Sequence, residues 1–121
     1  MISNDLIINI KYNKNENLIY SSNFKGEITT FSLDGKEVEK IKTNFNFPIY
    51  DMLKVDDQLW IASQAGLILW ENNTPKTIFN EDMVFNLALK GNNIYFGTRS
   101  AIFSTNKNKH DSTKIVLNKK R

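Results

Sequence analysis

A motif of five residues recurs three times in the chain and constrains its fold more than any other feature. Each copy reads aliphatic, aliphatic or aromatic, aliphatic or aromatic, small, then hydroxyl. The copies are Leu18-Ile19-Tyr20-Ser21-Ser22, Leu59-Trp60-Ile61-Ala62-Ser63 and Ile94-Tyr95-Phe96-Gly97-Thr98. Their first residues lie 41 and 35 residues apart, near the period of about 40 to 50 residues of repeats built from four strands. Three tandem copies of one structural unit are therefore predicted.

Further segments recur on either side of the motif. An apolar run with Asn or Asp in third place precedes each copy: Ile7-Ile8-Asn9-Ile10, Ile49-Tyr50-Asp51-Met52 and Val84-Phe85-Asn86-Leu87. A second apolar run and then a more polar segment follow each copy. The turns between these segments contain Asn, Asp and Gly, which tolerate the left-handed backbone of hairpin turns. Each unit is therefore predicted to be a sheet of four antiparallel strands.

Such units are typical of the blades of a β-propeller. The predicted fold class is all-β, with three four-stranded antiparallel blades forming a partial or half propeller. Residues 1–121 form a single segment, with blades at about 6–41, 47–79 and 83–117. Closed propellers have about four to eight blades, so three blades leave the faces of the first and last ones open. The expected partners of those faces are additional blades or a second copy of the chain, which would complete a six-bladed ring; an open stack with polar ends is the alternative.

A helix after Asp82 is the main competing interpretation. The apolar residues that follow Asp82 keep helical spacing, and Asp82 is a suitable cap. The repeat argues against this helix, because Val84 stands ten residues before Ile94, as Ile49 stands ten residues before Leu59. A strand is therefore predicted there.

Composition and charge argue against several classes of protein. The net charge of +3 is too small to predict a nucleic-acid partner, and the basic tail over residues 107–121, which lacks interleaved aromatic residues, is interpreted as a solvated end. No cysteine, one histidine and no glycine-rich phosphate loop are present, so no metal and no cofactor are expected. The longest apolar run, Leu67 to Trp70, is too short to cross a bilayer, so no membrane partner is expected.

The second copy resembles the two-component regulator propeller repeat, in which an aliphatic strand and an acidic turn precede the letters LWIGT and a small loop ending in GL. Leu59-Trp60-Ile61-Ala62-Ser63 and Gly66-Leu67 carry this resemblance, Gly97-Thr98 matches the Gly-Thr pair, and Ser21-Ser22 departs from it. The resemblance implies a sensor domain that binds ligands, often carbohydrate-derived, and a periplasmic or extracellular location. Residues 1–5 show no signal-peptide pattern, which implies a cytoplasmic location if the chain is complete.

Loop residues at one end of the predicted blades are candidates for binding a small glycan or peptide, because a propeller holds many loop tips around one axis. These candidates are Asn23, Lys25, Gln64 and Arg99. Asp51 and Asn86, together with Asn9, form a polar column on the innermost strands. This column is expected either to bind a ligand in the central channel or to cap backbone groups there. Phe45 and Phe47, in a connection between blades, are expected either to wedge between the blades or to touch a ligand.

No residue set predicts catalysis, so the chain is expected not to be an enzyme. His110 has no nucleophile or carboxylate cluster beside it and is interpreted as a solvated loop residue, and the pairs Asp56-Asp57 and Glu81-Asp82 fall in predicted turns. The first functional hypothesis is a non-catalytic ligand-binding or sensor segment of a larger ring. A structural scaffold for protein interactions is the second. A propeller-type enzyme that uses Asp51 as an axial carboxylate is the third and has the least support.

Overall fold

The structure, a computed structural model, describes residues 6–117. Within this range the chain forms three four-stranded antiparallel sheets and no helix, and therefore no helix that could cross a membrane. Residues 1–5, on which the signal-peptide interpretation rests, and residues 118–121, the end of the basic tail, lie outside the described range. The all-β fold with three four-stranded blades agrees with the prediction from the repeat.

Each sheet corresponds to one copy of the repeat, and its strands are paired in chain order. Blade 1 contains β1 (Ile7–Asn13), β2 (Leu18–Asn23), β3 (Ile28–Ser32) and β4 (Glu37–Ile41). Blade 2 contains β5 (Ile49–Val55), β6 (Gln58–Ser63), β7 (Gly66–Glu71) and β8 (Thr74–Phe79). Blade 3 contains β9 (Asn86–Lys90), β10 (Asn93–Gly97), β11 (Ala101–Asn106) and β12 (Ser112–Leu117).

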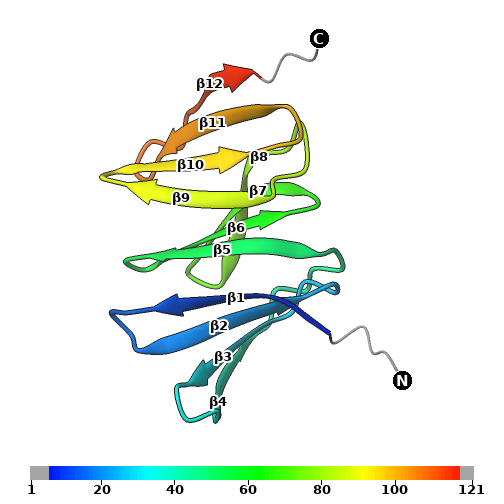
Figure 1. Cartoon of the computed structure of the whole chain (residues 1–121), viewed down its shortest axis with the longest axis vertical. Helices are drawn as coiled ribbons and strands as arrows, with labels where there is room; N and C mark the ends of the chain where they lie inside the picture. The colour runs from blue at the N-terminus through cyan, green and yellow to red at the C-terminus, as the bar shows by residue number, and fades with distance from the viewer. Residues whose placement is uncertain (1–5, 118–121) are drawn as a thin grey trace.

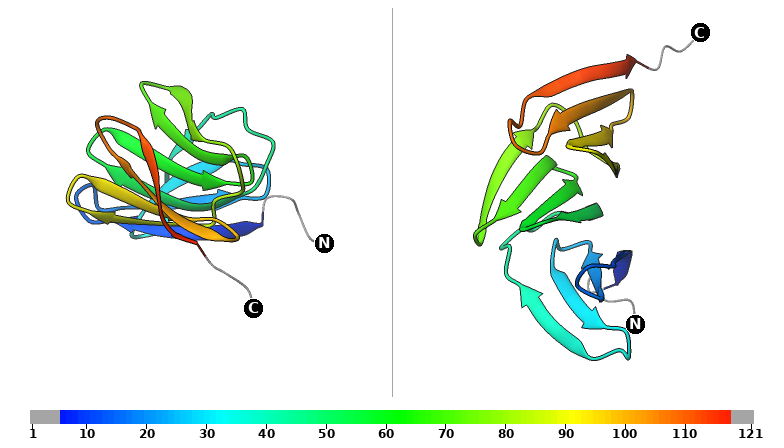
Figure 2. Two further views of the ribbon diagram at one scale, coloured as in Figure 1. Left: turned by 90° about the horizontal axis from the view of Figure 1, so that it is seen from above. Right: turned by 90° about the vertical axis from the view of Figure 1, so that its left-hand side faces the viewer.

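The three blades fan out into a crescent (Figure 2). The first strands of the blades, β1, β5 and β9, lie next to one another along the inner side (Figure 1). The last strands, β4, β8 and β12, lie on the outer side (Figure 2). This arrangement, with strands running in order from an inner to an outer position, is that of consecutive blades of a propeller.

Blade 2 is buried on both faces, and this explains its continuous apolar runs. Successive side chains of a strand point to opposite faces, so Leu59 and Ile61 pack toward blade 1, whereas Trp60 and Ala62 pack toward blade 3. All four side chains are buried. A strand with cover on both faces has no need for alternating polar residues, and the resulting apolar run makes this copy of the repeat the easiest to recognise.

The predicted strand near residue 84 is confirmed, but it begins two residues later than expected. β9 starts at Asn86, and no helix forms after Asp82. Val84 lies in the connection from blade 2, where its side chain is fully buried and its backbone N–H donates to Ser63 O at 3.0 Å. Burial of Val84 between two blades therefore explains its apolar character without membership of a strand.

The structure shifts the alignment of the first copy of the five-residue motif by one residue. In each blade the strand that carries the motif pairs with the innermost strand, and the pairing shows which residues are equivalent. Ser22 lies opposite Asn9, Ala62 lies opposite Asp51, and Gly97 lies opposite Asn86, so Ser22, Ala62 and Gly97 occupy the same position in their blades. In blade 1 the two positions of the small-hydroxyl pair are therefore occupied by Ser22 and Asn23, and not by Ser21 and Ser22, as the sequence comparison predicts. Leu18 resembles Leu59 and Ile94 in chemistry, so sequence comparison alone selects the wrong residue; the structural counterpart of both is Ile19.

Gly66 marks a close approach of the backbone between β7 and β8. Its φ angle is +116°, and a Cβ atom at this position would collide with Phe79 O. Gly91 also has a positive φ angle, +60°, but apart from its chain neighbours no atom lies within 4 Å of the place a Cβ atom would take. Both positions favour glycine for conformational reasons, and only Gly66 has a steric reason in addition.

We expect Gly66→Ala to destabilise the fold much more than Gly91→Ala. At Gly91 the conformational cost of alanine in the left-handed region is about 1–2 kcal/mol. At Gly66 the φ angle of +116° lies outside that region, which L-residues rarely leave at positive φ, and the collision with Phe79 O adds to the cost. Urea denaturation of the two variants measures the difference in the free energy of unfolding. Equal losses of stability would contradict the close approach of Gly66 to Phe79.

Candidate functional site

Three equivalent loops gather at one end of the blades. They join β2 to β3, β6 to β7 and β10 to β11, and in each the residue at its start binds the loop backbone. Asn23 Oδ1 accepts hydrogen bonds from Lys25 N and Glu27 N, both at 3.0 Å. Ser63 Oγ accepts from Ala65 N at 3.1 Å, and Thr98 Oγ1 accepts from Ala101 N at 3.1 Å. The shared pattern confirms that Asn23 is the counterpart of the two hydroxyl residues.

The predicted loop candidates differ in how far they are available to a ligand. Lys25, Gln64 and Arg99 are exposed on the three loops, and Arg99 Nε forms an ion pair with Asp82 at 2.9 Å. Asn23 is buried, and its amide also donates to Glu27 at 2.8 Å. The fold therefore uses the whole side chain of Asn23 to shape its loop, while the other three side chains reach the surface.

Asp51 connects all three innermost strands. Its Oδ2 accepts a hydrogen bond from Leu87 N in β9 at 2.8 Å, and its Oδ1 accepts from Met52 N at 2.9 Å. Lys11 in β1 forms an ion pair with Oδ1 at 3.0 Å. The carboxylate is buried, so its charge is compensated by groups from both neighbouring blades. This arrangement corresponds to the predicted alternative in which the column caps backbone groups.

The other two members of the column have different surroundings. Asn86 is exposed on blade 3. Asn9 Oδ1 is buried without a hydrogen-bond partner among the described residues. The Met52 N–H, which by its position in the repeat would serve Asn9, donates to Asp51 instead. The three positions are thus equivalent in the repeat but not in their contacts.

Replacing Asp51 with alanine is expected to destabilise the fold by about 1–3 kcal/mol, because the Leu87 N–H loses its acceptor inside the protein. Asp57→Ala is the matched control, since Asp57 is exposed and lies in the turn after β5. Chemical denaturation of both variants measures the effect. A similar stability for the two variants would show that Asp51 does not link the blades.

Two other candidates from the sequence prove to be packed between elements. Phe45 stacks on Phe47 at a centroid distance of 4.8 Å and meets the edge of Trp70 at 6.1 Å, so the rings of Phe45 and Phe47 pack against the core between blades 1 and 2.

His110 is partly covered by its neighbours, whereas the sequence predicts a solvated loop residue. Lys76 Nζ lies 3.0 Å from its Nδ1, and its ring meets Trp60 edge to face.

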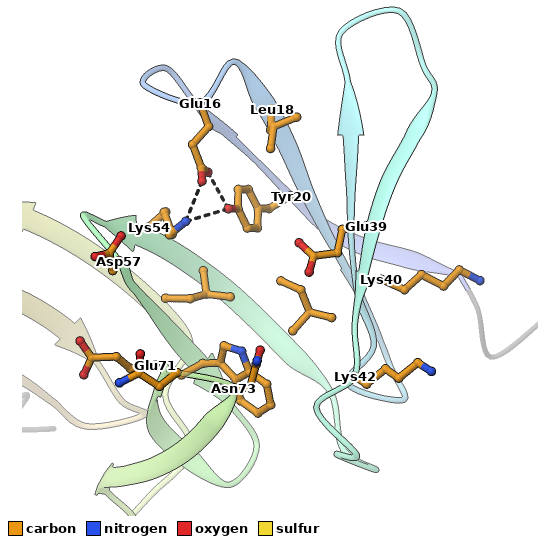
Figure 3. A pocket seen from close by; sticks show the side chains of 14 residues that line it. Glu16, Leu18, Tyr20, Glu39, Lys40, Lys42, Lys54, Asp57, Glu71 and Asn73 are labelled. Atoms are coloured by element: carbon orange, nitrogen blue, oxygen red, sulfur yellow. Dashed lines mark hydrogen bonds and ion pairs between the residues drawn. The ribbon is translucent and has the colours of Figure 1, made fainter.

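A cleft that sequence reasoning missed lies between blades 1 and 2 (Figure 3). Its volume is about 500 Å³, within the range of about 300–1,000 Å³ that is usual for ligand sites. None of the predicted site residues lines it. It is lined by Glu16, Leu18, Tyr20, Glu39, Lys40, Ile41, Lys42, Lys54, Asp57, Leu59, Trp70, Glu71, Asn72 and Asn73.

One wall of the cleft carries a hydrogen-bonded group of three side chains (Figure 3). Tyr20 donates to Glu16 at 2.6 Å, and Lys54 donates to Glu16 at 2.7 Å and to the Tyr20 hydroxyl at 3.2 Å. Burial alone would raise the pKa of Glu16, but the bonds from Lys54 and Tyr20 outweigh it and hold this pKa below its usual value. Burial and the bond to Glu16 raise the pKa of Tyr20. Burial alone would lower the pKa of Lys54, but the bonds to Glu16 and Tyr20 overcome this effect and raise it.

The outer part of the blade 1 wall is formed by β4, whose side chains alternate. Glu39 points into the cleft toward Tyr20, whereas Lys40 and Lys42 point away from it (Figure 3). Ile41 lies on the same face as Glu39, since the two pair with Ile28 and Thr30, whose side chains are buried. The Glu39 carboxylate has no ion pair or hydrogen bond among the described residues. The cleft therefore offers an apolar floor and a carboxylate that is free to accept hydrogen bonds.

The bonded group predicts a pH-dependent effect of Glu16→Gln. Because the pKa of Glu16 is lowered in the folded state, its stabilisation is present above the ordinary Glu pKa of about 4.3 and is lost as the pH falls through the lowered value. We expect Glu16→Gln to lower the free energy of unfolding by about 0.5 kcal/mol at neutral pH, the size usual for a partly exposed pair. The difference from the unmodified protein should vanish in acid.

Denaturation curves at several pH values measure this dependence. Glu39→Gln, in the same cleft but without a partner, serves as the control and should show no such trend. A Glu16→Gln effect that stays constant from neutral to acid pH would disprove the assigned role of the Glu16 carboxylate.

No group of three or more His, Asp or Glu side chains arranged to hold a metal ion is found within residues 6–117. The cleft and the loops offer hydrogen bonds, charge and apolar contact. These are the means by which a protein binds a small polar ligand or a peptide.

Solved structures of low sequence identity share the fold. The extracellular domain of a protein assigned as a one-component system of B. thetaiotaomicron superposes with a TM-score of 0.71 and 17% identity over 93% of this chain and 16% of its own. The WD40 β-propeller domain of Doa1 gives 0.69 and 17% over 85% of this chain and 36% of its own. The β-propeller domain of Cps50 (Swd1) from Myceliophteria thermophila gives 0.71 and 14% over 96% of this chain and 40% of its own.

These similarities show that the chain has the fold of part of a β-propeller domain. The chain spans less than half the length of each of the three structures. No family model and no curated protein sequence matches it. The architecture is therefore shown by shape and strand order, and at these identities the likeness extends to the fold alone.

Proposed function

We propose that the chain is a non-catalytic, ligand-binding segment of a larger β-propeller, with a sensor or interaction role. The observation that carries this proposal is the cleft between blades 1 and 2, where the bonded group of Glu16, Tyr20 and Lys54 lies next to the unpaired carboxylate of Glu39. Rigid sheets hold both walls, which favours binding because little ordering is needed when the ligand arrives.

The ligand we propose is a small glycan or a short peptide. Trp70 and Ile41, both partly exposed, provide apolar surface in the cleft, and Glu39, Lys54 and Asn73 provide acceptors and donors around it. A flat apolar contact combined with a few directed polar groups suits a molecule that carries hydroxyl or amide groups on an apolar frame.

A sensor role is supported by the resemblance of the second repeat to the two-component regulator propeller family. The fold similarity to the extracellular domain from B. thetaiotaomicron agrees with it. The absence of catalysis is supported by Asp51, whose two oxygens accept bonds from Leu87, Met52 and Lys11. A carboxylate held in this way is poorly placed to act as an acid or base on a substrate.

The proposal is tested with glycan and peptide arrays probed by the unmodified chain, Glu39→Gln and Gln64→Ala. Glu39 lies in the cleft and Gln64 on the loop rim, and both side chains are exposed, so neither change should disturb folding. Loss of a charged hydrogen bond to the ligand should weaken binding about tenfold or more in Glu39→Gln. Binding by Gln64→Ala should be unchanged.

The outcomes separate the hypotheses. Binding lost only in Gln64→Ala would move the site to the loops that include Lys25 and Arg99. An unmodified chain that binds neither glycans nor peptides would reject the ligand-binding function and favour the scaffold function. The scaffold function is supported independently by apolar side chains, such as Ile10 and Ile102, exposed on the first and last blades.

A further inference from the structure

The packing between blades follows one rule at both internal boundaries. We call the face of a blade that points toward the next blade its leading face, and the face that points toward the preceding blade its trailing face. The leading face of blade 2, with Trp60 and Leu69, is covered by the trailing face of blade 3, with Ile94 and Phe96. The leading face of blade 1, with Tyr20 and Ile28, is covered by the trailing face of blade 2 in the same way.

Within residues 6–117, two faces lack such cover: the leading face of blade 3 and the trailing face of blade 1. Strand pairing sets Ile10 opposite Ser21, so Ile10 shares the trailing face of blade 1 with Ile19 and points away from the face of Tyr20. Ile19 is the counterpart of Leu59 and Ile94, which are buried, yet Ile19 is partly exposed and Ile10 is 63% exposed. Apolar positions that the repeat buries elsewhere are thus open to solvent here.

The leading face of blade 3 has matching features. Ile102, the counterpart of buried Leu67, is 44% exposed, and Tyr95, the counterpart of buried Trp60, is partly exposed. Each open face therefore carries apolar side chains at the positions that form the internal boundaries. Both are suited to packing against a face of the opposite kind.

Polar groups on the two open faces are complementary as well. Asp51 links blade 2 to blade 3 by accepting from Leu87 N. Its counterpart on the open leading face is Asn86, which is exposed, and the counterpart of Leu87 in β1 is Ile10. Of the two internal boundaries only that between blades 2 and 3 has this bond, because the Met52 N–H donates to Asp51 rather than to Asn9. An amide oxygen can accept the same bond as a carboxylate, so Asn86 offers an acceptor for the Ile10 N–H of a following blade.

The charges at the turns also match. Asp56, after β5, forms an ion pair with Lys107, after β11, at 3.0 Å across the boundary between blades 2 and 3. At the open faces the corresponding turns carry Lys90, at the end of β9, and Asp34, after β3. Their charges are opposite, with the signs exchanged relative to the internal pair.

We infer that two copies of this chain pair head to tail, with the leading face of blade 3 in each copy covering the trailing face of blade 1 in the other. The inference rests on the proposed function as a propeller segment and names its partner. One contact, made twice, covers all four open faces with two-fold symmetry. Two copies supply six blades, within the range of about four to eight found in closed propellers.

The test measures the mass of the unmodified chain by light scattering and sedimentation over a range of concentrations. The expected result is a dimer with twice the 14.0-kDa mass of the chain. Ile10→Glu places a charge on the open face and should raise the dimer dissociation constant about tenfold or more. Leu89→Gln is the matched control: Leu89 is 42% exposed on the opposite, trailing face of blade 3, so the dimer should persist.

Charge reversal provides a second test. Lys90→Glu alone should weaken the dimer by up to about fivefold, the range of an exposed ion pair, and adding Asp34→Lys should restore it. Circular dichroism verifies that each variant is folded. A folded monomer at every concentration, an open-ended series of larger assemblies, or equal effects of Ile10→Glu and Leu89→Gln would overturn the inference. A monomer that still binds its ligand would leave the proposed function intact, whereas a dimer that binds no ligand would reject only that function.

Discussion

Face-to-face packing between adjacent sheets is the constraint on which the rest of the structure depends. A four-stranded sheet with apolar side chains on both faces is stable only when a neighbour covers each face, because burial of apolar surface is the main source of stability. Blade 2 meets this requirement through Trp60 on one face and Ile61 on the other. The buried connection at Val84 contributes to the same packing.

The same packing determines where polar groups can act. Near the inner strands the blades are close together, so Asp51 is buried and must be satisfied by neighbouring blades. Farther out the blades diverge as the crescent opens (Figure 2). The gap between blades 1 and 2 there becomes a cleft, and the bonded group of Glu16, Tyr20 and Lys54 lies at its inner end. The spacing of the blades thus leaves a structural carboxylate in the interior and a candidate binding site at the surface.

Sequence reasoning predicted binding residues on the loops and did not find the cleft. Gln64 and Arg99 follow directly from the repeat, because each lies one residue after a repeated hydroxyl position. The cleft joins Tyr20 to Lys54, which lie on different blades and are 34 residues apart. One local signal was present: in β4 the acidic Glu39 lies on the face of the apolar Ile41, opposite the lysines. Such alternation shows which residues share one face of a strand, but it does not show which other blade lies against that face.

The amino-acid pattern alone was sufficient to predict the class of fold, the number of blades and most of the strands. Strand formation and hairpin turns depend on residues that are close in the chain, and the same pattern of such residues occurs three times. Tertiary structure alone decided the register of the first copy and the role of Asn23. Leu18 and Ile19 have similar chemistry, so only pairing with β1 could show which of them is the counterpart of Leu59. The contacts of Asp51, the cleft and the two open faces were likewise decided there, since each depends on how separate blades lie in space.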